Sequence, residues 1–91
     1  MDRIEIHRDK CGKLNATYIA KNHDYGDSFA KVRTVVPNAI LVRLHDKLNR
    51  LTTLMSGENA MVKGESIDDT LLDLANYALM ELVEREVERH G

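Results

Sequence analysis

Three polar residues in the last third of the chain have a spacing that could bind a metal ion. Asp69, Asp73 and Asn76 are separated by four and three residues, so they share one face of an α-helix. Carboxylate and amide oxygens are ligands that Mg²⁺ accepts, and a bound Mg²⁺ bridges phosphate oxygens and lowers the pKa of an attacking water. The spacing leaves an alternative open, in which Asp69 caps the helix together with Ser66 and Asp73 is a solvated surface residue.

A group of basic residues lies earlier in the chain and could receive a phosphate. Arg43, Lys47 and Arg50 are four and three residues apart, with Asp46 among them. Arginine offers a planar fork of donors and lysine a point charge, and both bind phosphate oxygens. Two interpretations stay open. Either the three cations form a phosphate pocket, or Asp46 and Arg50 form a surface ion pair while the Lys47 stem covers apolar surface.

The segment over residues 21–28 gathers polar groups, a glycine and an aromatic ring. Tyr25 could stack on a nucleotide base, and Asp24 or Asp27 could add a carboxylate to the metal ligands. The alternative is a simple capping turn, in which Gly26 ends one helix and Asp27 begins the next.

The amino-terminal part of the chain is expected to form a helix over about residues 4–23, followed by a short helical turn over residues 28–33. Gly12 interrupts the first pattern, and the alternation of apolar and polar residues at Ile4–His7 also fits a strand. The strand stays open as an alternative for this short stretch.

Two further helices follow. One begins near Pro37, a residue favoured in a first helical turn, and ends at Gly57. The other begins at the capping box Ser66-Ile67-Asp68-Asp69, after a loop over residues 57–65. Towards its end, alternating acids and bases indicate a solvated tail over Glu81–His90.

Apolar residues at helical spacing predict the packing faces of these two helices. On the earlier helix they are Ile40, Leu41, Leu44, Leu48, Leu51 and Met55. On the later helix the main stripe is Ile67, Leu71, Leu74, Ala75, Ala78 and Leu82, widened by Leu72, Leu79 and Val83. A chain of this length buries only about 60–65% of its unfolded surface. We therefore expect one all-α domain over residues 1–91, a compact helical bundle completed by homo-oligomerisation.

Composition argues against several classes of protein. The formal net charge of −2 disfavours direct DNA binding through a basic surface. No apolar run approaches the roughly 18–20 residues that span a bilayer, and no signal-peptide pattern follows Met1. The single cysteine, Cys11, cannot form an internal disulfide. These features predict a soluble cytoplasmic protein with no membrane partner.

Three ordered segments resemble a known family. They are KNHDYGDSF at residues 21–29, RLHDKLNRL at residues 43–51 and ESIDDTLLDLANYA at residues 65–78. Together they are similar to the nucleotide modification associated domain 1 family of bacteriophages and prophages, over about residues 14–83. The resemblance implies a role in nucleotide metabolism or modification, and the host cytoplasm as the location of a phage-encoded member.

The helical layout also resembles the MazG-like nucleoside triphosphate pyrophosphatases. Those enzymes hold Mg²⁺ with E-x-x-E on one helix and E-x-x-D on a later one, and they cleave between the α- and β-phosphates. Asp69 and Asp73 would stand near the second motif, whereas Asp46 is the only acid on the earlier helix. Because three basic residues surround Asp46, like-charge repulsion discourages a multi-Mg²⁺ cluster there. The resemblance therefore supports nucleotide binding better than hydrolysis.

We predict a nucleotide-binding protein. The residues expected to bind substrate are Lys21, Asp24, Tyr25, Arg43, Lys47, Arg50 and Asn76. In the case of hydrolysis, Asp69 and Asp73 would be the catalytic residues of a Mg²⁺-dependent pyrophosphatase, with Asp46, Asp69 and Asp73 as metal ligands. Two alternatives stay open: a non-catalytic binder that sequesters a nucleotide or cyclic nucleotide in anti-defence, and a helical module that binds other proteins. The site could also be shared between chains.

Overall fold

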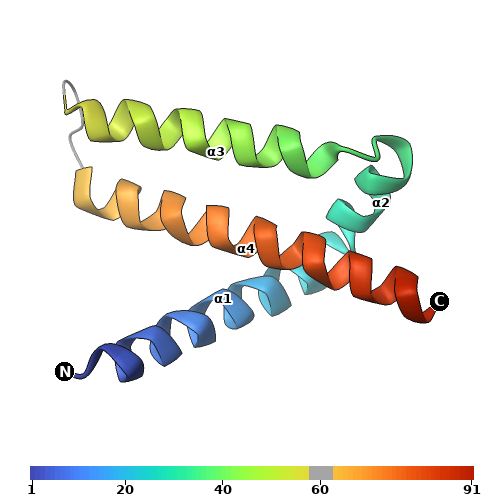
Figure 1. Cartoon of the computed structure of the whole chain (residues 1–91), viewed down its shortest axis with the longest axis horizontal. Coiled ribbons are helices and arrows are strands. Elements are labelled where there is room, and N and C mark those ends of the chain that lie inside the picture. Colours follow the sequence, from blue (N-terminus) through green and yellow to red (C-terminus); the bar gives the residue numbers. More distant parts are fainter. Residues whose placement is uncertain (58–62) are drawn as a thin grey trace.

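The computed structural model describes residues 1–57 and 63–91, and the side chains of these residues except Tyr25 and residues 63–66. Within them the chain forms four α-helices, α1 (Arg3–Tyr25), α2 (Ser28–Val35), α3 (Ala39–Ser56) and α4 (Lys63–His90), and no strand (Figure 1). The all-α prediction is confirmed. In the described part of the chain, none of the helices is long and apolar enough to cross a membrane.

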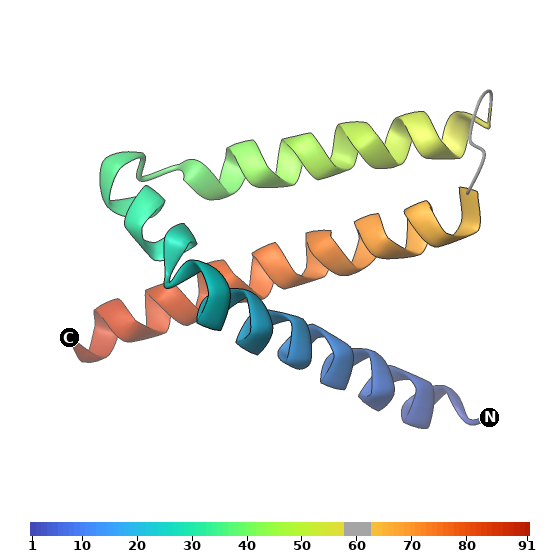
Figure 2. The ribbon, with the colours of Figure 1, turned by 180° about the vertical axis from the view of Figure 1, so that it is seen from behind.

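Helices α3 and α4 form an antiparallel hairpin that dominates the tertiary contacts. Helix α1 crosses one side of α4, and its amino-terminal half diverges from the hairpin (Figures 1 and 2). The short α2 connects α1 to α3. Because α1 diverges, the radius of gyration is 14.9 Å, whereas a compact domain of this length has a radius of about 12 Å.

Helix α1 is continuous from Arg3 to Tyr25 and passes through Gly12. The alternative of a strand at Ile4–His7 is therefore wrong. At the start of the helix, Oδ1 of Asp2 accepts a hydrogen bond from the Ile4 amide at 3.1 Å, which satisfies one of the first free amides. This cap and the i to i+4 bonds of a long helix favour the helical state over the short alternating pattern.

The turn between α1 and α2 depends on two consecutive residues with positive φ. Gly26 has a φ of 50° and donates its amide to the Asn22 carbonyl, so it ends α1 where the sequence predicts. Asp27 has a φ of 40°, and its amide donates to Oδ1 of Asn22 at 3.3 Å. Asp27 occupies the N-cap position of α2, but its described side chain makes no capping hydrogen bond.

The later helix ends differ in part from their predictions. Helix α3 begins at Ala39, two residues after Pro37, and ends at Gly57, where a φ of 84° completes the predicted stop. Helix α4 already begins at Lys63, before the predicted capping box. Within the expected loop, residues 63–65 are helical, and residues 58–62 lie outside the described residues.

The predicted solvated tail over Glu81–His90 is wrong at its first residue. Helix α4 continues to His90, and Glu81 is buried. An arginine of α2 pairs with this carboxylate, which is what makes its burial tolerable. A pattern of alternating charges shows that a segment can be solvated, but it cannot show that one of its acids has a distant partner.

The helices bury little apolar surface against one another. Among the described residues, the buried hydrophobic side chains are Phe29 and Ala39, and the buried polar ones are Thr70 and Glu81. The main apolar stripe predicted for α4 is only partly covered: Ile67 and Leu74 are half-buried, whereas Leu71, Ala75, Ala78 and Leu82 are exposed. Helix α4 instead turns the side that carries Thr70 and Glu81 towards its neighbours. The predicted stripe on α4 is wide, and the described chain covers only part of it.

Candidate functional site

A cavity of about 300 Å³ lies where all four helices approach one another. It is lined by Tyr18, Lys21 and Asn22 of α1, Asp27, Ser28, Phe29 and Ala30 around the start of α2, Arg43 of α3, and Asp73, Asn76, Tyr77, Met80 and Glu84 of α4. We call it the aromatic cavity. Its volume is at the lower end of the range for small-molecule sites, about 300–1,000 Å³.

Aromatic rings from two helices form part of the cavity wall. The ring centroids of Phe29 and Tyr77 are 6.2 Å apart with an interplanar angle of 50°, a favourable tilted arrangement. The guanidinium carbon of Arg43 lies 5.9 Å from the centroid of Tyr77, within the range of a cation–π contact. Arg43 is thus held by the face of a ring, which leaves its N–H donors available to a ligand.

Two cations of the aromatic cavity have no anionic partner within the described part of the chain. They are Lys21, which is exposed, and Arg43, which is half-buried. Three carboxylates, of Asp27, Asp73 and Glu84, also line the cavity. The lining therefore offers both donors for anionic oxygens and acceptors for hydroxyl or amino groups.

An ion pair beside the cavity joins α3 to α4. Nζ of Lys47 lies 3.1 Å from Oδ2 of Asp73. The sequence left open whether Lys47 enters a polar pocket or lies on the surface. In the structure its ammonium group contacts the carboxylate of Asp73, which lines the cavity. Arg50, the third predicted phosphate-binding residue, is exposed and lines neither cavity described here.

A second cavity, of about 340 Å³, lies between α1 and α4. We call it the α1–α4 cavity, and its lining includes Lys13, Thr17 and Asp69. Asp73 and Asn76 line both cavities, so they form the wall between them. Nδ2 of Asn76 donates a hydrogen bond to the Leu14 carbonyl at 3.2 Å, which ties α4 to α1 at this wall.

The structure does not bring the three predicted metal ligands together. Asp69 and Asp73 line the α1–α4 cavity, but Asp46 is exposed and lines neither cavity. In residues 1–57 and 63–91, no three His, Cys, Asp or Glu side chains approach as closely as metal ligands would. One of the two carboxylates that share the α1–α4 cavity, Asp73, is also paired with Lys47.

The polar segment at the end of α1 is only partly brought into the site. Lys21 lines the aromatic cavity. Asp24 is exposed, and its Oδ1 lies 3.2 Å from Nδ1 of the neighbouring His23. The side chain of Tyr25 lies outside the described residues, so its predicted stacking role is not placed. The rings that do reach the cavity, Tyr18, Phe29 and Tyr77, were missed because only Tyr25 lay in an evident polar turn.

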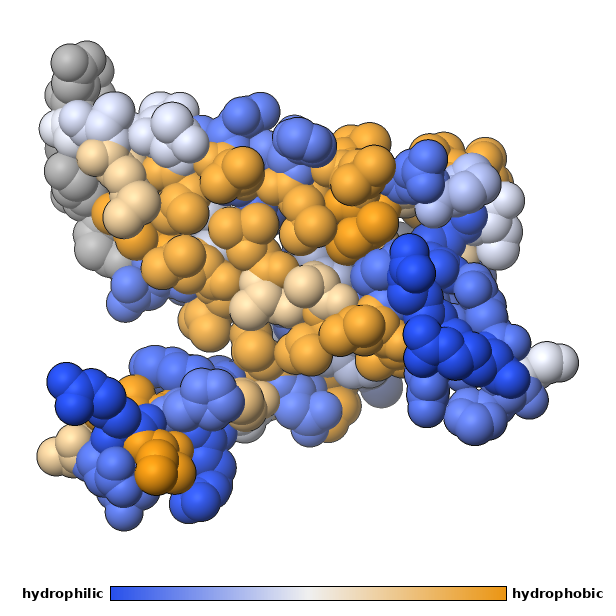
Figure 3. All heavy atoms as spheres, viewed as in Figure 1, coloured by the Kyte–Doolittle hydropathy of each residue, from blue (hydrophilic) through white to orange (hydrophobic). Residues whose placement is uncertain are grey.

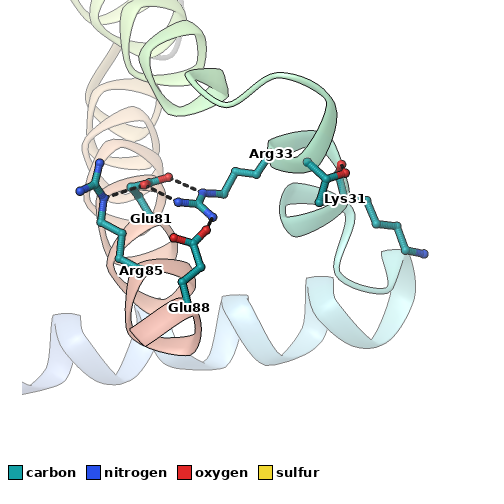
Figure 4. A network of polar contacts seen from close by, with 6 residues as sticks. Lys31, Arg33, Glu81, Arg85 and Glu88 are labelled. Atoms are coloured by element: carbon teal, nitrogen blue, oxygen red, sulfur yellow. Dashed lines mark hydrogen bonds and ion pairs between the residues drawn. The ribbon is translucent and has the colours of Figure 1, made fainter. Parts of the chain in front are cut away.

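A network of charged side chains fixes α2, which carries Phe29, against α4 (Figure 4). Nε and Nη2 of Arg33 donate to the two carboxylate oxygens of Glu81 at 2.9 and 3.0 Å. Arg33 also pairs with Glu88, and Nε of Arg85 donates to Glu81 at 2.8 Å. The hydrogen bonds from Arg33 lower the pKa of Glu81, and Arg85 adds to this, whereas Glu81 raises the pKa of Arg33.

The chain folds into an all-α arrangement with two cavities between its helices. The model of the family described as nucleotide modification associated domain 1 matches residues 21–84. The chain belongs to this family, and the predicted family membership is confirmed. No curated protein and no solved structure gives a significant match. The likeness to MazG-like enzymes and the phage setting stay predictions.

Proposed function

We propose that this protein binds a nucleotide or cyclic nucleotide in the aromatic cavity. One observation carries the proposal: Arg43 is held over the ring of Tyr77 at the edge of a cavity that also contains Phe29. A nucleotide combines an aromatic base, hydroxyl groups and an anionic phosphate. The cavity lining combines rings, carboxylates and unpaired cations, so it matches all three chemistries. The description of the family points in the same direction.

The arrangement suggests how a nucleotide would lie. Its base would stack against the rings of Tyr77 and Phe29, because stacking on an aromatic side chain tolerates any base. Its phosphate would be bound by Arg43 and Lys21, the lining cations that pair with no carboxylate among the described residues, and Lys47 could join them by leaving Asp73. Asn76 keeps its carboxamide oxygen for a polar edge of the ligand, since its nitrogen already donates to Leu14.

The contacts favour binding over hydrolysis. Two carboxylates, Asp69 and Asp73, line one cavity, but one of them is paired with a lysine. We therefore propose a binder whose affinity does not require Mg²⁺, and Mg²⁺-dependent pyrophosphate release is the second candidate that the same test decides.

The test combines titration calorimetry with phosphorus NMR on a panel of ribo-, deoxy- and cyclic nucleotides, with and without Mg²⁺. We expect at least one nucleotide to bind and to be recovered unchanged after the protein is denatured. Arg43→Ala should weaken that binding about tenfold or more, because a charge-assisted contact to phosphate is lost. Arg50→Ala is the matched control on the same helix, since Arg50 lines neither cavity.

Three outcomes would contradict the proposal. They are no binding by any member of the panel, an equal loss of affinity in the Arg43 and Arg50 variants, and the appearance of pyrophosphate with a monophosphate. The last result would establish the second candidate.

A further inference from the structure

One side of the α3–α4 hairpin is an exposed apolar surface. It carries Leu41, Leu48 and Met55 of α3 and Leu71, Ala75, Ala78 and Leu82 of α4, which we call the apolar face. Leu48, Met55 and Leu82 keep 51%, 62% and 59% of their surface exposed. Figure 3 shows apolar side chains gathered over both helices on the side of the hairpin turned away from α1.

The spacing of these residues is that of helices that pack in bundles. In α4, positions 71, 75, 78 and 82 follow intervals of four, three and four. In α3, positions 41, 48 and 55 are seven apart, with Leu44 and Leu51 between them. Apolar residues at alternating intervals of three and four form the seam of a coiled coil or a four-helix bundle. Each helix of the hairpin therefore presents a bundle seam that the described chain covers only in part, since Leu44 and Leu51 are half-buried and the other seam residues named for α3 and α4 are exposed.

The chain exposes more surface than a compact monomer of its mass. The chain exposes 7152 Å², whereas a monomeric protein of 10.4 kDa exposes about 5,400 Å². The excess of roughly 1,800 Å² comes from the diverging α1 as well as from the apolar face, and it is larger than the approximately 800 Å² that each partner buries in a standard complex.

We infer that a second copy of this chain covers the apolar face, hairpin against hairpin, so that α3 and α4 of two copies form a four-helix core. The partner must be present whenever the chain is folded, because the described residues bury only Phe29 and Ala39 as hydrophobic core. A second copy meets that condition. It also brings an identical pair of seams, which suits the self-complementary patch of a two-fold interface.

The inference is independent of the proposed nucleotide site. Asp73 and Asn76, which line the cavities, project from the side of α4 opposite Leu71 and Leu82. Dimerisation would therefore leave the aromatic cavity open. Arg43→Ala should weaken nucleotide binding without changing the mass of the assembly, so failure of one proposal does not imply failure of the other.

The experiment measures mass and thermal stability of the whole chain. Light scattering after size-exclusion chromatography should give about twice 10.4 kDa. The Tm of an obligate dimer rises with concentration, here by about 4 °C for each tenfold increase. Leu48→Glu should give a single-chain mass or an unfolded chain. Thr53→Glu, exposed on the same helix but outside the apolar face, should stay dimeric.

The concentration series keeps the test decisive even if the Leu48 variant does not fold. A single-chain mass together with a Tm independent of concentration would overturn the inference. So would a dimer that Leu48→Glu leaves unchanged, because a different surface would then hold the copies together. A native particle containing one copy and a different protein would equally contradict it.

Discussion

Nζ of Lys47 lies 3.1 Å from Oδ2 of Asp73, and this contact joins α3 to α4 beside the two cavities of the domain. Both side chains are partly shielded from solvent. The lysine compensates a carboxylate that would otherwise be available to a metal ion. In the proposed binding mode, a phosphate in the aromatic cavity would compete with Asp73 for this ammonium group, and the pair would then link ligand binding to the α3–α4 contact.

Replacing Lys47 with alanine should weaken nucleotide binding about tenfold, or about 1.4 kcal/mol. The free energy of unfolding should fall by less than about 1 kcal/mol, because a partly exposed ion pair contributes little. Calorimetry and urea denaturation measure the two effects. Lys10→Ala, on the exposed part of α1, is the control and should change neither. A variant that loses stability but keeps its affinity would show that Lys47 has only a structural role.

Replacing Asp73 with asparagine separates binding from metal-dependent hydrolysis. A binder should keep its affinity or gain up to about tenfold, because Lys47 would lose its competing carboxylate. Chelation with EDTA should leave that affinity unchanged. Calorimetry with and without EDTA measures the affinity, and phosphorus NMR detects any turnover. Turnover in the original chain that disappears in Asp73→Asn, with helix content intact, would instead assign Asp73 to catalysis.

Replacing Tyr77 with leucine should lower the affinity for a purine nucleotide about tenfold, since base stacking contributes about 1–3 kcal/mol to binding. Inorganic pyrophosphate has no base and should bind nearly as before. Tyr77→Phe keeps the ring and should retain most of the nucleotide affinity. Competition titrations of the two ligands make the comparison. If the leucine variant weakened both ligands equally, Tyr77 would act on Arg43 rather than on a base.

Stability should decrease in acid because of Glu81. Hydrogen bonds from Arg33 hold the pKa of Glu81 below its ordinary value of 4.5. In acid, the carboxyl of Glu81 is therefore more often protonated in the unfolded chain than in the folded chain. The contribution of Glu81 is fully present above pH 4.5 and is lost as the pH falls through the lower folded pKa.

The measurement for Glu81 is the Tm between pH 7 and pH 3. Glu81→Gln should lower the Tm at pH 7 by several degrees and reduce its dependence on acid. Glu86→Gln, an exposed position on the same helix, should retain the acid dependence of the original chain. An unchanged acid dependence in Glu81→Gln would rule out this pair as its source.

Part of the site followed directly from the spacing of residues. Asp69, Asp73 and Asn76 line the α1–α4 cavity together because four- and three-residue intervals fix one face of a helix. The residues that contact this face could not be predicted from spacing. Lys47 and Asp73 belong to different helices, as do Arg43 and Tyr77, and only the packing of α3 on α4 decides which faces meet.

The sequence by itself determined the helical class, the ends of α1 and α3 at Gly26 and Gly57, and the family, because periodicity, glycine stops and ordered motifs are local properties of the chain. Tertiary structure decided what each helix face contacts. It buried Glu81 against Arg33, left Asp46 outside the site and exposed the stripe that contains Leu71 and Leu82. A helix with apolar residues on more than one side has several possible packings. The choice depends on contacts between distant segments, which local spacing does not specify.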